Sequence, residues 1–182
     1  MVYLFLAEGF EEIEALTPVD ILRRAGVKVT TVGIGSRTVV GSHGIPVTAD
    51  LTEDEFMKVL SNDNLSAIIL PGGMPGTKNL DASKTVDKAL ETAVSEDKLI
   101  CAICAAPMIL GKRNLLKGRE AICYPGFEQY LTGAVISNDN VAVSDNIITA
   151  KGMGVALNFS LKIVEKLKDI ETLEKIRKSV IA

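Results

Sequence analysis

Short apolar segments alternate with longer amphipathic segments along this chain, and this alternation constrains the fold more than any other feature. The apolar segments, each too short for a stable helix, are residues 2–7, 27–33, 65–70, 98–103 and 147–150. Segments with helical spacing of apolar residues are 11–25, 84–95, 105–112, 155–167 and 170–180. Strands buried on both faces that alternate with helices indicate a parallel sheet between two helical layers. We therefore predict an α/β sandwich that forms a single domain over residues 1–182.

Several weaker signals complete this reading of the chain. Shorter strand-like segments occupy residues 38–40, 45–48, 120–123, 134–136 and 141–143. Gly26 follows the helical segment 11–25 and is expected to end it. Pro18 lies inside the same segment and predicts a kink or a break near Thr17, because proline lacks the N–H group that a helix interior needs.

The composition excludes several classes of protein. Of 182 residues, 47% are hydrophobic and 24% are charged, which is not typical of a disordered chain. The formal charge of −3 gives no basic surface for a nucleic-acid partner. Apolar runs are far shorter than the ~20 residues of a membrane span, so we expect no membrane association. The three cysteines are a poor disulfide framework, and the start of the chain lacks a basic signal-peptide region; both favour a cytoplasmic location.

The strongest chemical signal is Cys104, which ends the apolar segment 98–103 where a helix is expected to begin. A nucleophile on such a sharp strand-to-helix turn needs small residues two positions away on each side, and Ala102 and Ala106 supply them. The turn would place the thiol at a helix N-terminus, where backbone N–H groups stabilise a thiolate. The alternative is an ordinary buried cysteine, and the spacing alone leaves both interpretations open.

The other cysteines and the only histidine suggest no further site. If residues 101–103 are strand, the Cα atoms of Cys101 and Cys104 lie roughly 10 Å apart. A disulfide requires no more than ~7 Å, so we expect Cys101, and by default Cys123, to be core residues. His43 lies in the glycine-rich segment 41–44, and one histidine with three poorly spaced cysteines predicts neither a Cys–His–Asp triad nor a metal site.

Two other predicted strands are followed by polar or glycine-rich residues. Gly73, after the strand 65–70, either forms a tight turn or presents its N–H group to an oxyanion. The Lys–Ser/Thr pair of a phosphate-binding loop is missing, so we expect no nucleotide cofactor. Glu11 and Glu12 are expected at a helix start, facing water. Glu14 either lies on the same solvated face or points to the strand ends, where a buried carboxyl with a raised pKa would hydrogen-bond a thiolate.

Together these motifs resemble the ThiJ/PfpI superfamily, in the branch of the Parkinson disease protein deglycase and ThiJ-like proteins. The likeness is carried by residues 11–14, 18–20, 23–26, 70–73, 102–107 and 152–154, so it runs nearly end to end. It implies a flavodoxin-like sandwich of the class I glutamine amidotransferase-like type, without a cofactor, usually as a homodimer. It also implies that Cys104 is the nucleophile, that protonated Glu14 hydrogen-bonds it, and that the N–H groups of Gly73 and Ala105 stabilise an oxyanion.

The resemblance implies two alternative functions. One is a cysteine-dependent glyoxalase or deglycase acting on methylglyoxal, glyoxal and their adducts, with a hemithioacetal on Cys104 and Glu14 as proton shuttle. The other is a non-enzymatic sensor or chaperone for oxidative stress, in which Cys104 is oxidised.

Three positions qualify the resemblance. Peptidase-like members carry histidine where this chain has Ala105, which argues against a PfpI-type peptidase. Tyr124 stands where the deglycase branch often has a histidine. A phenol is a poor base at neutral pH, so Tyr124 is expected at most to orient a substrate carbonyl. His43 matches a position that tends to approach the site from a partner subunit.

Overall fold

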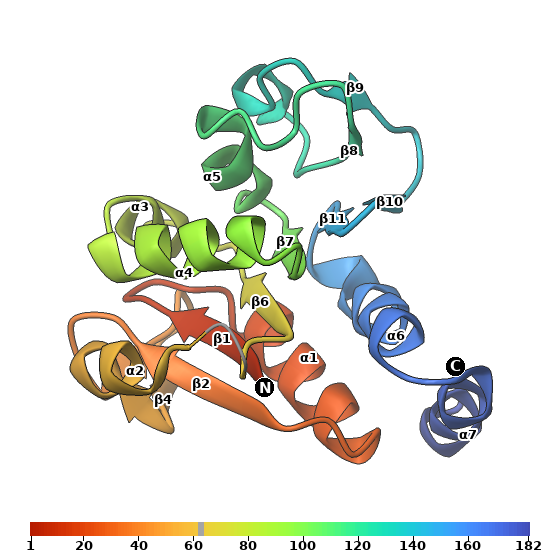
Figure 1. The fold of residues 1–182 in the computed structure, drawn as a ribbon, viewed down its shortest axis with the longest axis horizontal. Helices are drawn as coiled ribbons and strands as arrows, with labels where there is room; N and C mark the ends of the chain where they lie inside the picture. The colour runs from red at the N-terminus through yellow and green to blue at the C-terminus, as the bar shows by residue number, and fades with distance from the viewer. Residues whose placement is uncertain (62–63) are drawn as a thin grey trace.

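The computed structural model describes residues 1–61 and 64–182, and a parallel sheet forms the centre of this part of the chain (Figure 1). Its strand order is β10-β11-β7-β6-β1-β2-β5, and neighbouring strands are parallel except β10 and β11, which are antiparallel. The strands are β1 (Val2–Leu6), β2 (Val29–Gly33), β5 (Leu51–Thr52), β6 (Ala67–Leu70), β7 (Leu99–Ile103), β10 (Val141–Ser144) and β11 (Ile147–Ala150). The predicted mostly parallel α/β sheet is confirmed.

Two small sheets lie outside the central one. β3 (Thr38–Val40) pairs with β4 (Pro46–Thr48) in an antiparallel hairpin. β8 (Glu120–Ala121) pairs in parallel with β9 (Val135–Ile136), close to the one-turn 3-10 helix η1 (Glu128–Tyr130).

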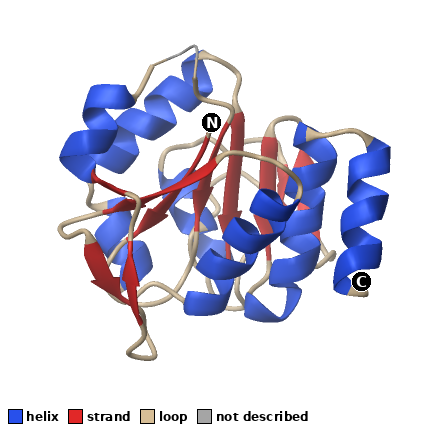
Figure 2. Ribbon diagram, turned by 90° about the horizontal axis from the view of Figure 1, so that it is seen from below, coloured by secondary structure: helices blue, strands red, loops and turns tan. Residues whose placement is uncertain are grey.

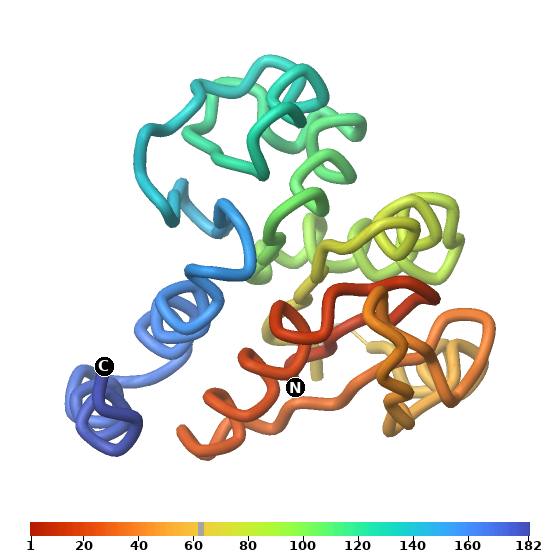
Figure 3. The backbone as a smooth tube through the Cα atoms, turned by 180° about the vertical axis from the view of Figure 1, so that it is seen from behind, coloured from red at the N-terminus to blue at the C-terminus, as the bar shows by residue number. Residues whose placement is uncertain are grey.

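Helices cover both faces of the central sheet, as the alternating pattern predicts (Figure 2). One layer contains α1 (Glu12–Arg24), α6 (Ala156–Leu167) and α7 (Ile170–Val180), and the short 3-10 helix η2 (Met153–Val155) leads into α6. The other layer contains α2 (Glu53–Val59), α3 (Gly76–Asp81), α4 (Lys84–Ser95) and α5 (Pro107–Lys112). The reverse view shows α7, which leads to the C-terminus, at the outer edge beyond α6 (Figure 3).

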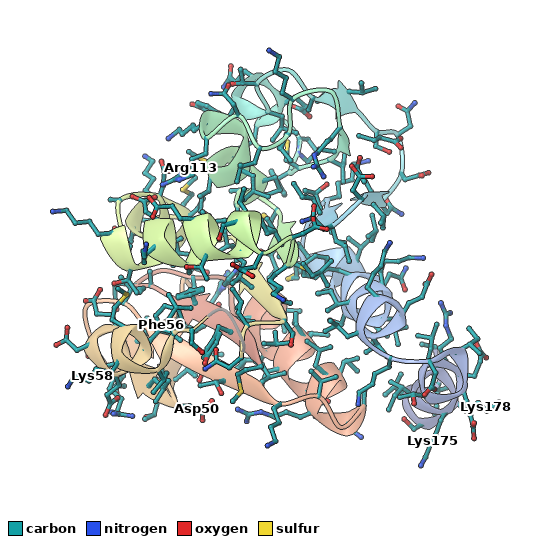
Figure 4. All side chains as sticks on the ribbon, in the orientation of Figure 1. Asp50, Phe56, Lys58, Arg113, Lys175 and Lys178 are labelled. Carbon is teal, nitrogen blue, oxygen red and sulfur yellow. The ribbon has the colours of Figure 1, made fainter. Side chains whose placement is uncertain are left out.

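The strand side chains form two hydrophobic cores because successive side chains of a strand point to opposite faces. In β1, Val2, Leu4 and Leu6 pack in the core beneath α1 and α6. Tyr3 and Phe5 point the other way, and both rings make edge contacts with Phe56 of α2, at centroid distances of 4.9 and 5.2 Å (Figure 4).

The structure differs from the sequence expectations in three helices. α1 continues through Pro18 without a break, so the break expected near Thr17 is wrong. Pro18 is itself buried, and the packing of this helix on α6 and the sheet stabilises it despite the lost hydrogen bond. α2 and α3 were not predicted, because both are short and only Phe56 of α2 is buried. The capping box of Thr52 and Glu55 was nevertheless visible in the sequence.

The sheet topology determines where a site can form. From β1 the chain builds outward to β2 and β5, then returns to the other side of β1 with β6, β7 and β11. Ligands of open α/β sheets bind beyond the carboxyl ends of the strands, at the point where this order reverses. Here that point lies between β1 and β6. No described helix is long and apolar enough to cross a membrane.

Candidate active site

The loops that follow four neighbouring parallel strands meet at the carboxyl edge of the sheet. They bring together Glu14 from the start of α1 after β1, Gly72 after β6, Cys104 after β7 and Gly152 after β11. Gly72 and Gly152 have no side chain to separate the other two residues. The carboxyl ends of β1, β6 and β7, where the sequence predicts reactive residues, therefore converge, and the end of β11 lies beside them.

Cys104 occupies a strained turn between β7 and α5. Its φ of 64° lies in the left-handed region, which non-glycine residues seldom adopt. Its N–H group donates to the Ala150 carbonyl over 2.9 Å, and its own carbonyl accepts from the N–H group of Tyr124 over 2.8 Å. These bonds from both sides hold the turn, so the predicted sharp strand-to-helix turn at Cys104 is confirmed.

Glu14 points to the strand ends and not to solvent. Its side chain is completely buried, and Oε2 accepts a hydrogen bond of 2.9 Å from the N–H group of Gly72. Glu11 caps α1 by accepting from the N–H group of Glu14 over 2.7 Å, which fixes the first turn of the helix. The other oxygen, Oε1, is buried and accepts no hydrogen bond of good geometry from the described residues.

Gly72 permits the close approach of Glu14 and Cys104. A Cβ atom on Gly72 would lie 2.6 Å from Glu14 Oε2 and 2.7 Å from Cys104 Cβ. Both distances are far below van der Waals contact, so any other residue at this position would push the carboxyl and the thiol apart. The sequence reasoning singled out Gly73 and missed this role of Gly72.

Burial and mutual interaction shift the pKa values of Glu14 and Cys104. Burial chiefly raises the pKa of Glu14 to about 7, and the charge of nearby Glu11 adds to the rise; the Cys104 thiol and the N–H groups of Gly72 and Met153 oppose it. Burial also raises the pKa of Cys104 to about 12, together with the Glu14 charge and hydrogen bond, while the N–H groups of Ala105 and Gly73 lower it.

These opposed effects change the expected chemistry of the thiol. The helix N-terminus alone does not produce a thiolate here, because burial and an ionised Glu14 both favour the neutral thiol. Protonation of Glu14 removes the carboxylate charge and so lowers the pKa of the thiol, while burial continues to favour the neutral form. The titrations of the two groups are therefore coupled.

A small cavity lies above the thiol. It has a volume of about 160 Å³, and the residues lining it are Gly73, Met74, Cys104, Ala105, Tyr124 and Phe127. The N–H groups of Gly73 and Ala105 face the sulfur. Half of the Tyr124 side chain is exposed, and its ring makes an edge contact with Phe127 at 6.5 Å. The sequence reasoning missed Phe127 because nothing in its neighbourhood marks the η1 region as part of a pocket.

His43 does not line this cavity within the described chain. Its ring Nδ1 lies 3.0 Å from Oε2 of Glu12, and its backbone N–H group donates to Oε1 over 2.8 Å. Burial tends to raise the pKa of Glu12, but these bonds lower it to about 2, and they raise the pKa of His43. The expectation that Glu11 and Glu12 face water is wrong: both are buried, one as helix cap and the other as partner of the 41–45 loop.

The side chains with the spacing of metal ligands already make hydrogen bonds within the protein. Within the described residues, the grouping with metal-like spacing is Glu11, Glu12 and His43, whose donor atoms lie within 4.8 Å of one another. The contacts among them and with backbone N–H groups occupy these donors. Cys101 and Cys123 are free thiols, and each is buried in one of the two cores, as expected.

Comparison with known proteins agrees with this geometry. The chain is 33% identical over 181 residues to Protein dj-1beta of Drosophila melanogaster. This match covers 98% of this chain and 95% of that protein. It is 34% identical over 172 residues to glutathione-independent glyoxalase DJR-1.2 of Caenorhabditis elegans, covering 94% and 90% of the two chains. The solved structure of oxidized Toxoplasma gondii DJ-1 superposes with a TM-score of 0.92 at 34% identity, covering 99% and 97%.

The family profile that matches extends over most of the chain. Residues 1–166 match the DJ-1/PfpI family, which includes every residue placed at the candidate site. The resemblance drawn from the sequence motifs is thereby confirmed. The chain belongs to the DJ-1/PfpI family, in its DJ-1 branch.

Proposed function

We propose that the protein is a cofactor-free glyoxalase that converts methylglyoxal or glyoxal to the corresponding hydroxy acid, and that adducts of these aldehydes are further substrates. The observation that carries this proposal is the buried contact of Glu14 with the Gly72 N–H group beside the Cys104 thiol. A carboxyl group with a pKa near neutrality can both accept and return a proton at physiological pH. A relative named as a glutathione-independent glyoxalase supports the same activity.

The reaction begins with addition of the Cys104 sulfur to the aldehyde carbon. Glu14 accepts the thiol proton as the carbon–sulfur bond forms, then gives it to the aldehyde oxygen, which leaves a hemithioacetal. The N–H groups of Gly73 and Ala105 stabilise the negative charge that develops on the substrate oxygen during addition. No proton has to be released to solvent, because the thiol proton moves by way of Glu14 to the substrate oxygen.

Isomerisation and hydrolysis complete the turnover. Glu14 removes the proton from the former aldehyde carbon, which gives an enediol, and delivers it to the adjacent carbon. The hydroxyl proton of the hemithioacetal passes to the former ketone oxygen, and the product is a thioester of lactate on Cys104. Water then cleaves the carbon–sulfur bond, releases lactate and restores the thiol. The sum is methylglyoxal plus water to lactate, with no net oxidation. Tyr124 orients the second carbonyl from the cavity wall.

The decisive experiment measures loss of methylglyoxal and formation of lactate without glutathione. We expect turnover by the wild type and a loss of at least about a thousand-fold in Cys104→Ala, because the covalent route requires the sulfur. Cys101→Ala is the matched control, since that thiol is buried in the core away from the cavity. Equal rates for Cys104→Ala and wild type would contradict the covalent mechanism.

A second prediction concerns the pH dependence of Glu14. The pKa in the folded state is about 7, against an ordinary value of 4.5, so the buried carboxylate costs stability increasingly between these two pH values and by a constant amount above them. We expect Glu14→Gln to raise the free energy of unfolding at pH 8 by about 1–3 kcal/mol, from ~1.4 kcal/mol per pKa unit. We expect almost no such gain at pH 4, where Glu14 is mostly protonated in both states.

The same variant tests the proton transfer. In the wild type, kcat/KM should rise with pH up to about 7 and then level off, because the carboxylate is the active base. Glu14→Gln should lose this limb and at least about a hundred-fold in rate. Urea unfolding and rate profiles between pH 4 and 9 provide both measurements, and a Gln variant that is fully active would exclude Glu14 as the proton shuttle.

A second candidate function is a sensor of oxidative stress. The half-buried Cys104 sulfur faces two N–H groups and a carboxyl group that can donate a hydrogen bond, which suits a sulfinate as well as a thiolate. Two molecules of hydrogen peroxide would each transfer one oxygen atom to the sulfur and leave as water. The similarity to a structure described as oxidized supports the proposal.

Peroxide titration followed by intact mass tests this candidate. We expect two oxygen atoms to add at Cys104 before Cys101 or Cys123 reacts, since those thiols are fully buried. Glu14→Ala should weaken this selectivity because it removes the hydrogen-bond donor to the sulfinate. Equal oxidation of all three cysteines would remove the sensor from consideration.

We further propose that the protein is a homodimer that associates through an apolar surface beside the site. Ile13 and Leu16 are exposed one turn apart on α1, and Ile45 is exposed on the loop that packs on the start of this helix. Such side chains side by side are typical of an interface.

Light scattering should report a dimer for the wild type and a monomer for Ile13→Glu, with Ile170→Glu on α7 as an exposed control. A monomeric wild type would contradict the proposal.

A further inference from the structure

Tyr124 forms part of the cavity wall above Cys104, but it lies on a segment outside the central sheet. This segment leaves β8, which lies beside β10 and β11 and pairs with β9 (Figure 1). β11 pairs with β7 on one side and with β10 on the other, so its backbone has no edge left for a further strand. No strand ladder in the described chain therefore joins the Tyr124 segment to the strands that carry the site.

Thr149 of β11 holds this segment through its side chain instead. Its Oγ1 accepts a hydrogen bond of 2.9 Å from the N–H group of Ile122, and both residues are buried. Ile148 and Ala150 point into the core beneath α1 and α6, so the intervening Thr149 points to the opposite face of the sheet. A buried N–H group requires a partner. The Thr149 hydroxyl is therefore the contact through which β11 binds the segment that leads to Tyr124.

This bond closes a ring of three hydrogen bonds around the turn at Cys104. The Tyr124 N–H group donates to the Cys104 carbonyl over 2.8 Å, and the Cys104 N–H group donates to the Ala150 carbonyl over 2.9 Å. Ala150 adjoins Thr149 in the sequence. Tyr124 follows Ile122 by two residues, so the chain itself completes the ring. The Thr149 hydroxyl therefore restricts where the Tyr124 segment lies relative to the turn that carries the sulfur.

We propose that Thr149 is a positioning residue for the reaction, which holds the Tyr124 ring in the cavity wall and so determines how tightly the aldehyde binds above Cys104. This proposal rests on the proposed glyoxalase function. Thr149 does not itself line the cavity, and it acts through the backbone of the segment before Tyr124. The hydrogen bond that Glu14 accepts from the loop after β6 does not involve it. Loss of the hydroxyl therefore impairs substrate binding and leaves the proton transfer by Glu14 intact.

The kinetics of two variants test this role. Thr149→Val keeps the shape of the side chain but leaves the Ile122 N–H group without its acceptor, so we expect KM for methylglyoxal to rise about ten-fold, with kcat within about three-fold of the wild type. Thr149→Ser keeps the hydroxyl and should retain the wild-type KM to within about two-fold. A role in folding alone would lower the amount of active protein, and so kcat, without changing KM. An unchanged KM in Thr149→Val would overturn the proposal.

Thr31→Val is the matched control. Thr31 of β2 is buried, and its Oγ1 accepts from the N–H group of Asp50 over 2.9 Å, which is the same type of bond on the other side of β1. We expect this variant to keep the wild-type KM, and an equal rise of KM in both valine variants would overturn the proposal. If circular dichroism shows that Thr149→Val does not fold, Thr149→Cys replaces it under the same criteria, because a thiol is a weak acceptor.

A double variant tests whether Thr149 acts through the tyrosine ring. We expect Tyr124→Ala alone to raise KM. Adding Thr149→Val to it should change KM by less than about two-fold, because two residues that act through one contact are not additive. A further rise of about ten-fold in the double variant would mean that Thr149 acts elsewhere, and this result would overturn the proposal.

Hydrogen exchange of backbone amides distinguishes failure of this proposal from failure of the glyoxalase function. By NMR, the N–H groups of Ile122 and Tyr124 should exchange at least about ten-fold faster in Thr149→Val than in the wild type, because they belong to the broken ring. The Gly72 N–H group, which is bound to Glu14, should keep its rate. If methylglyoxal is not turned over but this pattern holds, the positioning of Tyr124 by Thr149 stands and the glyoxalase function fails. If the Tyr124 rate does not change, the proposal is overturned with or without turnover.

Discussion

The buried contact between the Glu14 carboxyl and the loops after β6 and β7 is the interaction on which the functional part of this structure depends. It joins two sides of the topological switch point, since Glu14 follows β1 and the N–H group that it accepts belongs to Gly72. The approach is possible only without a side chain at Gly72, where a Cβ would fall within 2.7 Å of both partners. One glycine therefore determines whether Glu14 and Cys104 can lie in contact.

This contact is unfavourable for stability, and the rest of the fold has to compensate for it. The buried carboxyl group with a raised pKa and the cysteine with a positive φ both lower the stability of the folded state. Two cores, one on each face of the sheet, supply the compensating apolar burial. Backbone bonds from Ala150 and Tyr124 then restrict the turn at Cys104 from both sides. Together the two cores and these backbone bonds stabilise the strained site.

The coupling of Glu14 and Cys104 also explains why both proposed functions fit one site. A thiolate that attacks an aldehyde and a thiolate that reacts with peroxide need the same transfer of a proton to Glu14 and the same N–H groups of Gly73 and Ala105. What differs is the space around the sulfur. The proposed aldehyde substrate would occupy the cavity above Cys104, whereas an oxidant does not need this space.

The sequence by itself determined the sheet, its two helical layers and the turn at Cys104, because these follow from local periodicity and from small residues at fixed spacing. It also indicated Glu14 as the candidate acid, although the choice between a solvated and a buried carboxyl depended on family resemblance. Only the tertiary structure decided that Glu11 and Glu12 are buried, that His43 binds Glu12, and that Gly72 and Gly152 leave room beside the reacting groups. These contacts join loops that are distant in sequence. Burial, pKa and cavity shape depend on such contacts, whereas periodicity records only which face of an element is apolar.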